Sequence, residues 1–166
     1  MNRTLEHILP RVQKPARYTG GEYNAVVKDR DRVDVRYALC FPDTYEIGMS
    51  NLGVRILYGV MNEMEGVWCE RVFAPWVDME EQMRKEHLPL YALESLDPVG
   101  EFDIIGFTLQ YELSFTNVLN MLDLAGVPVR AADREMRAFL KERVKEICEG
   151  TAATFRGKAE VEFVYG

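Results

Sequence analysis

The side chains of this chain that could do chemistry are concentrated in two polar segments, residues 43–53 and 108–118. Each segment follows an apolar run and precedes an amphipathic one. Hydroxyl, amide and carboxylate groups at such positions can hold polar ligands, and glycines let the backbone approach a ligand closely. The candidate cofactor-binding residues are Thr44, Tyr45, Glu46, Gly48, Ser50, Asn51 and Gly53 in the first segment, and Gln110, Tyr111, Glu112, Ser114 and Asn117 in the second.

Ordinary turn and helix-capping roles are the alternative for both segments. Ser50 or Asn51 could cap the helix that follows the first segment, and Ser114 the helix that follows the second. Glu46 and Glu112 could form an acid/base pair across a crevice. Neither segment has the glycine spacing of a dinucleotide fingerprint or the Gly-Lys-Ser/Thr ending of a nucleotide-hydrolase loop.

The sequence predicts no catalytic residue and no metal site in this chain. A hydrolytic triad cannot be assembled, because the two histidines lie near the start and at the end of a charged helix. The three cysteines, Cys40, Cys69 and Cys148, lack the spacing of a zinc site, an iron–sulfur cluster or a disulfide framework.

The net charge is −7. This acidic balance argues against a nucleic-acid partner, which needs a basic field. Arg11, Lys14 and Arg17 form a local basic cluster, which we interpret as part of a solvated arm. No apolar stretch is long enough to cross a membrane, and the start has no secretory pattern, so we expect a cytoplasmic protein.

Alternating strand and helix patterns predict an α/β fold, a Rossmann-like three-layer domain with a short, mostly parallel sheet, plus a C-terminal helix and strand. The carboxyl ends of parallel strands share one edge, so the two polar segments should line one crevice. We expect an N-terminal arm (1–32), the Rossmann-like domain (33–133) and a tail (134–166). The predicted strands are 34–42, 67–76, 88–95, 101–111, 127–133 and 159–166, and the predicted helices are 52–64, 77–88, 112–126 and 134–155.

Two local predictions concern helix faces and ends. Leu52, Ile56, Val60 and Met64 share one face of the helix over 52–64, the pattern of a core-facing stripe. Asp78 is a plausible N-cap of the helix over 77–88.

The motifs KPARYTGGEYNAVVKD, ALCFPDTYEIGMSNLGVRILYGVMNE, CERVFAPWVDMEE, LYALES and DIIGFTLQYELSFTNVLNMLDLAGVPVRA resemble the N-terminal part of uncharacterised radical S-adenosylmethionine (SAM) proteins. The resemblance covers residues 9 to 132. It implies a cobalamin-binding-type domain next to a radical SAM catalytic domain, with the two polar segments as cofactor edges. It implies SAM and a 4Fe–4S cluster only in a full-length relative, because the CxxxCxxC motif is absent here.

The tail, residues 134–166, resembles a piece of the lid or dimerisation domain of metal-dependent amidohydrolases of the aminoacylase and carboxypeptidase type, without their metal ligands. Three functions therefore stay open. The first is a cobalamin-type module of a radical SAM enzyme that is not catalytic alone. The second is a structural module that self-associates through the strand over 159–166. The third is an amidohydrolase fragment.

Overall fold

A computed structural model describes residues 3–134 of the 166-residue chain. The chain divides into two compact units, Met1–Val127 and Pro128–Gly166, which are considered separately. The second unit is described only over residues 128–134, which include a short 3-10 helix, Ala131–Asp133. The predicted helix over 134–155 and strand over 159–166 lie almost entirely outside the described residues.

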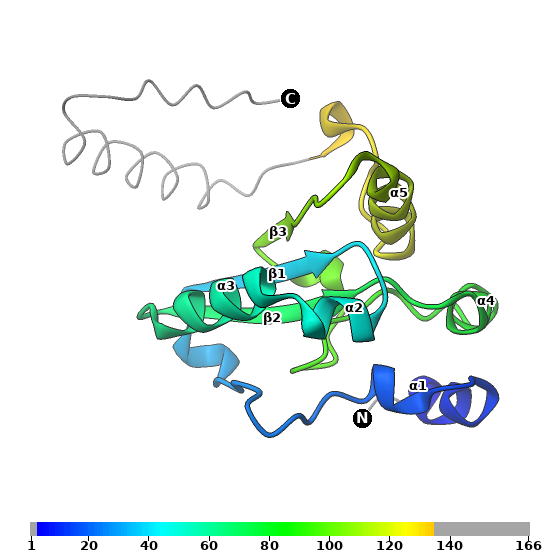
Figure 1. The fold of residues 1–166 in the computed structure, drawn as a ribbon, viewed down its shortest axis with the longest axis horizontal. Coiled ribbons are helices and arrows are strands. Elements are labelled where there is room, and N and C mark those ends of the chain that lie inside the picture. Colours follow the sequence, from blue (N-terminus) through cyan, green and yellow to red (C-terminus); the bar gives the residue numbers. More distant parts are fainter. Residues whose placement is uncertain (1–2, 135–166) are drawn as a thin grey trace. The chain divides into compact units, whose positions relative to one another are not determined.

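The first unit is built on a three-stranded parallel sheet in the order β2-β1-β3. The central strand β1 spans Val35–Phe41, β2 spans Val67–Phe73 and β3 spans Ile104–Phe107 (Figure 1). All seven residues of β1 pair with β2. Every residue of β2 after Val67 is buried, as expected for a parallel strand covered on both faces.

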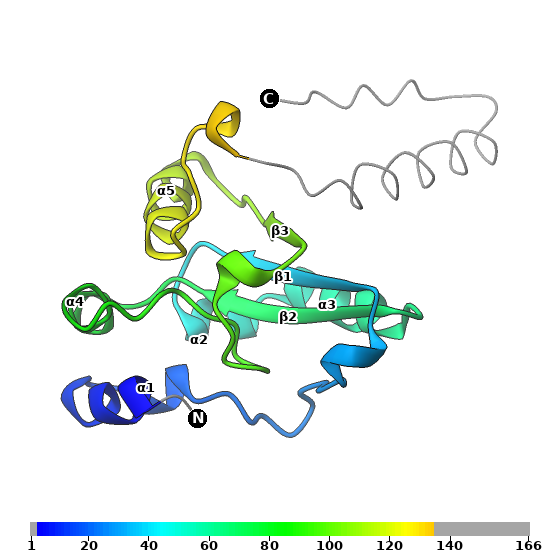
Figure 2. The ribbon, with the colours of Figure 1, turned by 180° about the vertical axis from the view of Figure 1, so that it is seen from behind.

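Helices cover both faces of the sheet. α3 (Leu52–Glu63) packs on one face, where it meets side chains such as Leu39 and Cys69, and lies in front of β1 and β2 in Figure 1 and behind them in Figure 2. The other face packs against α1 (Arg3–Ile8), α4 (Val77–Lys85) and α5 (Phe115–Leu124). Because successive strand residues point to opposite faces, two separate apolar cores result. The predicted α/β three-layer architecture is confirmed.

Two predicted strands are wrong. Residues 88–95 form no strand but only a single bridge between Tyr91 and Pro98. This segment gives part of its backbone hydrogen bonds elsewhere, since the Leu90 N–H donates to Leu124 O. Residues 127–133 form bends and a 3-10 helix instead of a strand.

Helix boundaries also differ from the sequence prediction. Residues expected as loop form a short helix, α2 (Tyr45–Ser50), and the helix expected over 112–126 begins with a 3-10 turn, Glu112–Ser114, ahead of α5. Asp78 is not an N-cap, because α4 begins one residue earlier. Its carboxylate instead accepts the backbone N–H of Gln13 at 2.7 Å.

The apolar stripe of α3 faces outward, contrary to the core-facing expectation. Leu52, Ile56 and Val60 are 66%, 55% and 55% exposed, whereas the buried residues of this helix are Val54 and Tyr58. The stripe therefore does not build the core of this unit.

The N-terminal segment contributes directly to the core. Besides α1 it contains the 3-10 turns Leu9–Arg11, Pro15–Tyr18 and Arg30–Arg32. A further 3-10 turn, Val99–Glu101, precedes β3. The buried residues of the N-terminal segment are Leu5, Ile8, Leu9, Val12 and Tyr18.

Gly20 allows a close backbone contact between the N-terminal segment and the chain beside β2. Its φ is +61°, and a Cβ there would lie 2.1 Å from the carbonyl oxygen of Leu93. Only glycine fits this approach without displacement.

Candidate functional site

The two polar segments follow β1 and β3 at the same edge of the sheet, where the carboxyl ends of these parallel strands meet. A side-chain amide ties the second segment to the residue just before the first, since Asn117 Nδ2 donates to the carbonyl oxygen of Pro42 at 2.9 Å. The Thr108 N–H likewise donates to Cys40 O at 3.0 Å. The fold thus brings the two predicted segments side by side.

Most polar side chains of the first segment are engaged by the protein itself. Tyr45 donates its hydroxyl to Glu22 at 2.9 Å, and Glu46 pairs with Lys14 at 3.1 Å and Arg17 at 2.9 Å. Since these cations come from the N-terminal segment, two of its basic residues serve to attach it to α2.

Two further members of the first segment stabilise local structure. Asn51 caps α3, because its side chain accepts the Val54 N–H at 3.1 Å. Ser50 donates back to the carbonyl oxygen of Ile47. The capping alternative is therefore realised at Asn51.

Glycine at position 48 is required by packing. Gly48 is buried, and a Cβ there would lie 2.1 Å from Cε1 of the Phe73 ring. Gly53 lies exposed in the first turn of α3, and Thr44 makes no side-chain cap hydrogen bond at the start of α2.

The second segment leaves more of its polar groups accessible. Ser114 is buried and donates to the carbonyl oxygen of Tyr111 at 2.6 Å. Gln110, Tyr111 and Glu112 are exposed, and within residues 3–134 no hydrogen bond or ion pair occupies their side chains. Among the described residues, these three side chains therefore have no protein partner.

Exposed apolar side chains surround these free polar groups. Leu113 is 80% exposed, and Leu109 and Phe115 are about half exposed. The second segment therefore presents both hydrogen-bonding groups and apolar side chains on its exposed surface.

The first segment leaves little room for a ligand. A cavity of about 20 Å³, bordered by Arg17, Tyr45, Phe73 and Tyr91 among others, lies beside it. This volume suits roughly one water molecule.

The charges at this edge do not favour proton transfer near neutral pH. The hydrogen bond from Arg17 is the main cause that lowers the pKa of Glu46 to about 2. Burial, with the hydrogen bond to Glu22, raises the pKa of Tyr45 to about 12. Glu46 is therefore ionised and Tyr45 protonated at pH 7, so neither matches the pKa of an efficient acid or base.

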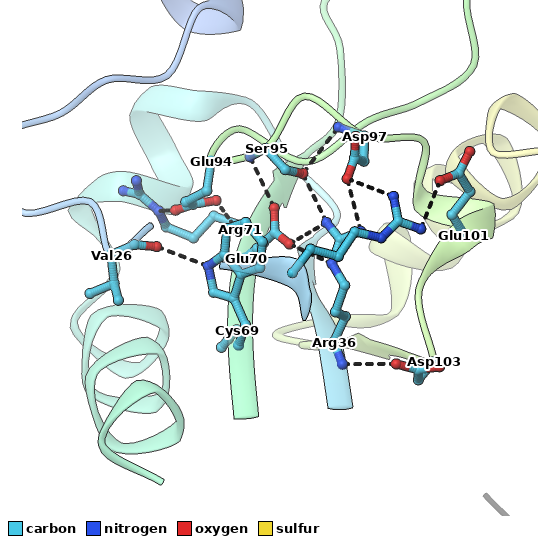
Figure 3. A network of polar contacts seen from close by, with 12 residues as sticks. Val26, Arg36, Cys69, Glu70, Arg71, Glu94, Ser95, Asp97, Glu101 and Asp103 are labelled. Atoms are coloured by element: carbon cyan, nitrogen blue, oxygen red, sulfur yellow. Dashed lines mark hydrogen bonds and ion pairs between the residues drawn. The ribbon is translucent and has the colours of Figure 1, made fainter. Parts of the chain in front are cut away.

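Sequence reasoning missed a buried ionic network next to β2 (Figure 3). Arg36 of β1 pairs with Glu70 of β2 and with Asp97 at 2.8 Å, while its guanidinium lies 4.2 Å from the centroid of the Phe102 ring. Burial raises the pKa of Glu70, and the pairing with Arg36 opposes that shift.

The other half of the network centres on Arg71. Its Nε donates to Glu94 at 2.6 Å, and its Nη2 pairs with Glu22 at 2.9 Å. The Glu94 carboxylate also accepts the backbone N–H of Arg71 at 2.7 Å, and the Leu93 N–H donates to the Arg71 carbonyl oxygen at 2.9 Å. These contacts occupy the outer edge of β2 (Figure 3).

A sequence signal for this network existed. Charged residues stand inside apolar strand patterns, as Arg36 does in β1 and the Glu70-Arg71 pair in β2. Charges within buried strands need partners, so their presence indicates an ion-pair network.

No group of His, Cys, Asp and Glu side chains within residues 3–134 could hold a metal ion. Over the same range no helix has the length and apolar character that crossing a membrane requires. Cys40 and Cys69 are free and buried.

An open parallel sheet covered by helices on both faces defines a Rossmann-like α/β module. The family described as radical SAM proteins, N-terminal, matches residues 53–163, about two thirds of the chain. The chain therefore belongs to this family. No curated protein and no solved structure matches it.

The family match includes residues 134–163 of the tail. The resemblance of this tail to amidohydrolases stays a prediction.

Proposed function

We propose that this chain acts as the N-terminal module of a radical SAM enzyme and is not catalytic by itself. The observation that carries the proposal is the family match over residues 53–163. SAM and a 4Fe–4S cluster belong to full-length members of such a family, and the three cysteines here lack the spacing to hold that cluster. The partner is then a radical SAM catalytic domain.

We further propose that the carboxyl edge of the sheet binds a cofactor of the cobalamin class. Gln110, Tyr111 and Glu112 offer donors and acceptors for the amide groups around a corrin ring, and Leu113 and Phe115 offer apolar contact. The composition of the edge fits such a group. The main role of these residues would be to bind and orient the cofactor.

The proposal does not include a histidine of this chain as a ligand of the cobalt ion. The chain has two histidines, His7 in α1 and His87 after α4, and neither follows β1 or β3. A cobalamin held here would rely on the polar and apolar contacts of the second segment. When bound, such a cofactor supplies radical or group-carrier chemistry through its metal.

A titration of the purified protein with hydroxocobalamin tests the cofactor proposal. We expect retention of the cofactor through gel filtration and a change in its visible absorption spectrum. Tyr111→Ala should weaken binding at least tenfold, while Tyr23→Ala, which removes a fully exposed tyrosine elsewhere, should leave it unchanged. Failure of the wild-type protein to retain the cofactor would contradict cobalamin binding but not the family membership.

The second candidate function is an interaction module. It is favoured by β3, which pairs only with β1 among the described strands and so is an edge strand of the described sheet. In that case residues 159–166 would pair with the sheet of another copy. Deleting these eight residues should abolish concentration-dependent dimerisation in sedimentation, and a dimer that survives the deletion would contradict this route.

A further inference from the structure

The outward face of α3, defined by Leu52, Ile56, Leu57 and Val60, is an apolar surface that the first unit does not cover. Each of these side chains is 44–66% exposed. Ile47 of α2 and Met64 after α3 are also about half exposed. Side chains of this number amount to a patch of roughly a few hundred Å², the size of the largest apolar patch on a typical monomer, which is often functional.

α3 cannot turn this face inward, because polar contacts fix its rotation. The Asn62 side chain donates to Cys69 O at 2.9 Å and accepts the Cys69 N–H at 3.0 Å, which ties the inner side of α3 to β2. On the same side, the Tyr58 hydroxyl accepts the Val26 N–H at 2.7 Å. The apolar face therefore stays outward in the folded unit.

Gly59 gives independent support for a contact on this helix. Glycine in a helix interior weakens the helix, yet a Cβ at Gly59 would meet nothing within 4 Å. The fold described here does not require glycine at this position. A second backbone or side chain packed closely against α3 would require it.

The face is large enough for a contact between domains of one assembly, which buries roughly 600–1,500 Å² in total. The family defines this chain as the N-terminal part of radical SAM proteins, in which such a neighbour is the catalytic domain.

We propose that the outward face of α3 docks against the radical SAM catalytic domain. The docking face is thus the side of α3 turned away from the sheet, and it leaves the second polar segment available for a ligand. This inference rests on the proposed function as a radical SAM module.

Site-specific photo-cross-linking in cells that carry the natural gene context tests the proposal. Ile56 is replaced by p-benzoylphenylalanine, and the matched control places the same group at Val77, an apolar residue of α4 that is also more than half exposed. We expect the label at Ile56, but not that at Val77, to cross-link to polypeptide that carries the CxxxCxxC motif, identified by mass spectrometry.

The other outcomes separate the two proposals. Cross-linking to the catalytic polypeptide from Val77, or equally from both positions, would overturn the docking face and leave the proposed function intact. Cross-linking of Ile56 to this chain, in the same molecule or a second copy, would also overturn it. Absence of any radical SAM polypeptide from both the cross-links and the native complex would overturn the proposed function together with the docking face.

A pair of charge variants adds an equilibrium measurement. Val60→Glu should weaken association with the catalytic polypeptide at least tenfold, and Val77→Glu should leave it unchanged. Both residues are exposed, so both variants should fold, which circular dichroism checks. Equal affinity of the two variants would contradict docking through α3.

Discussion

Arg71→Met should destabilise the first unit strongly, because it leaves a buried carboxylate without its cation. The side chain of Glu94 is 0% exposed, and Arg71 is its partner at 2.6 Å. Breaking a buried ion pair on one side typically costs about 3–5 kcal/mol. The same change removes the contact of the guanidinium with the Tyr58 ring, 4.8 Å from its centroid, and the pairing with Glu22. We expect a loss of about 4 kcal/mol.

That loss is large against the whole stability of a domain, which is about 5–15 kcal/mol. Urea unfolding followed by circular dichroism and tryptophan fluorescence measures it. With a slope of about 1.5 kcal/mol per molar urea, the midpoint should fall by roughly 2.5 M. The matched control is Arg55→Met, which removes an exposed arginine of α3 and should change stability by less than about 0.5 kcal/mol.

A double variant distinguishes the effect of leaving the buried Glu94 carboxylate without a cation from the effect of altered packing. Combining Arg71→Met with Glu94→Gln removes both charges while keeping a side-chain oxygen to accept the backbone N–H at position 71. We expect the pair of changes to recover at least half of the loss caused by Arg71→Met alone. A loss of under 1 kcal/mol in the free energy of unfolding of Arg71→Met would refute the reasoning. Additive effects of Arg71→Met and Glu94→Gln in the double variant would refute it as well.

Two further predictions concern the attachment of the N-terminal segment. Gly20→Ala should destabilise the unit by about 2 kcal/mol more than Gly21→Ala in the same urea assay, since both have positive φ but only a Cβ at Gly20 meets the Leu93 oxygen; equal losses would argue against this close contact. The folded-state pKa of Glu46 lies below its ordinary 4.5, so its contribution to stability is present above pH 4.5 and is lost as the pH falls toward about 2. An NMR titration of the Glu46 side-chain carboxyl should show this low pKa, and the pKa should be higher in the variant Arg17→Gln. A pKa of Glu46 above 4 in the wild-type protein would disprove the pairing with Arg17 in solution.

The strands β1 and β2 could be predicted from the sequence because they are largely buried on both faces and are mostly apolar. Residues 34–42 and 67–76 matched β1 and β2 closely for this reason. The segment over 88–95 has a similar apolar run but uses it differently. Its apolar residues Leu88 and Leu90 pack in the core, and its backbone binds β2 only around Leu93.

The rotation of α3 could not be predicted from its hydrophobic pattern. The pattern identifies an apolar stripe, but the inner side is set by Asn62 and Tyr58, whose polar groups find partners on β2 and the N-terminal segment. Satisfying buried polar groups outweighed the usual rule that the apolar stripe faces the core of its own domain. A module that belongs to a larger assembly can bury that stripe elsewhere.

The sequence predicted the sheet edge where the two polar segments meet, but it did not predict the hydrogen-bond and ion-pair partners of each side chain there. Parallel topology places the ends of β1 and β3 together. Which carboxylate is engaged depends on distant residues, as when Arg17 reaches Glu46 from 29 positions away. The spacing of residues along the chain does not predict such long-range contacts.

The Glu94 side chain has a consequence for how this sheet can be extended. It occupies the backbone N–H of Arg71 on the outer side of β2, where the Leu93 N–H and the Asn62 side chain bind further backbone groups, and together these contacts close that side to further pairing. Growth of the sheet is therefore one-sided, and any added strand must enter next to β3. Replacing the Glu94 carboxylate alone would leave this side closed, because the Asn62 side chain still occupies the backbone N–H and carbonyl oxygen of Cys69.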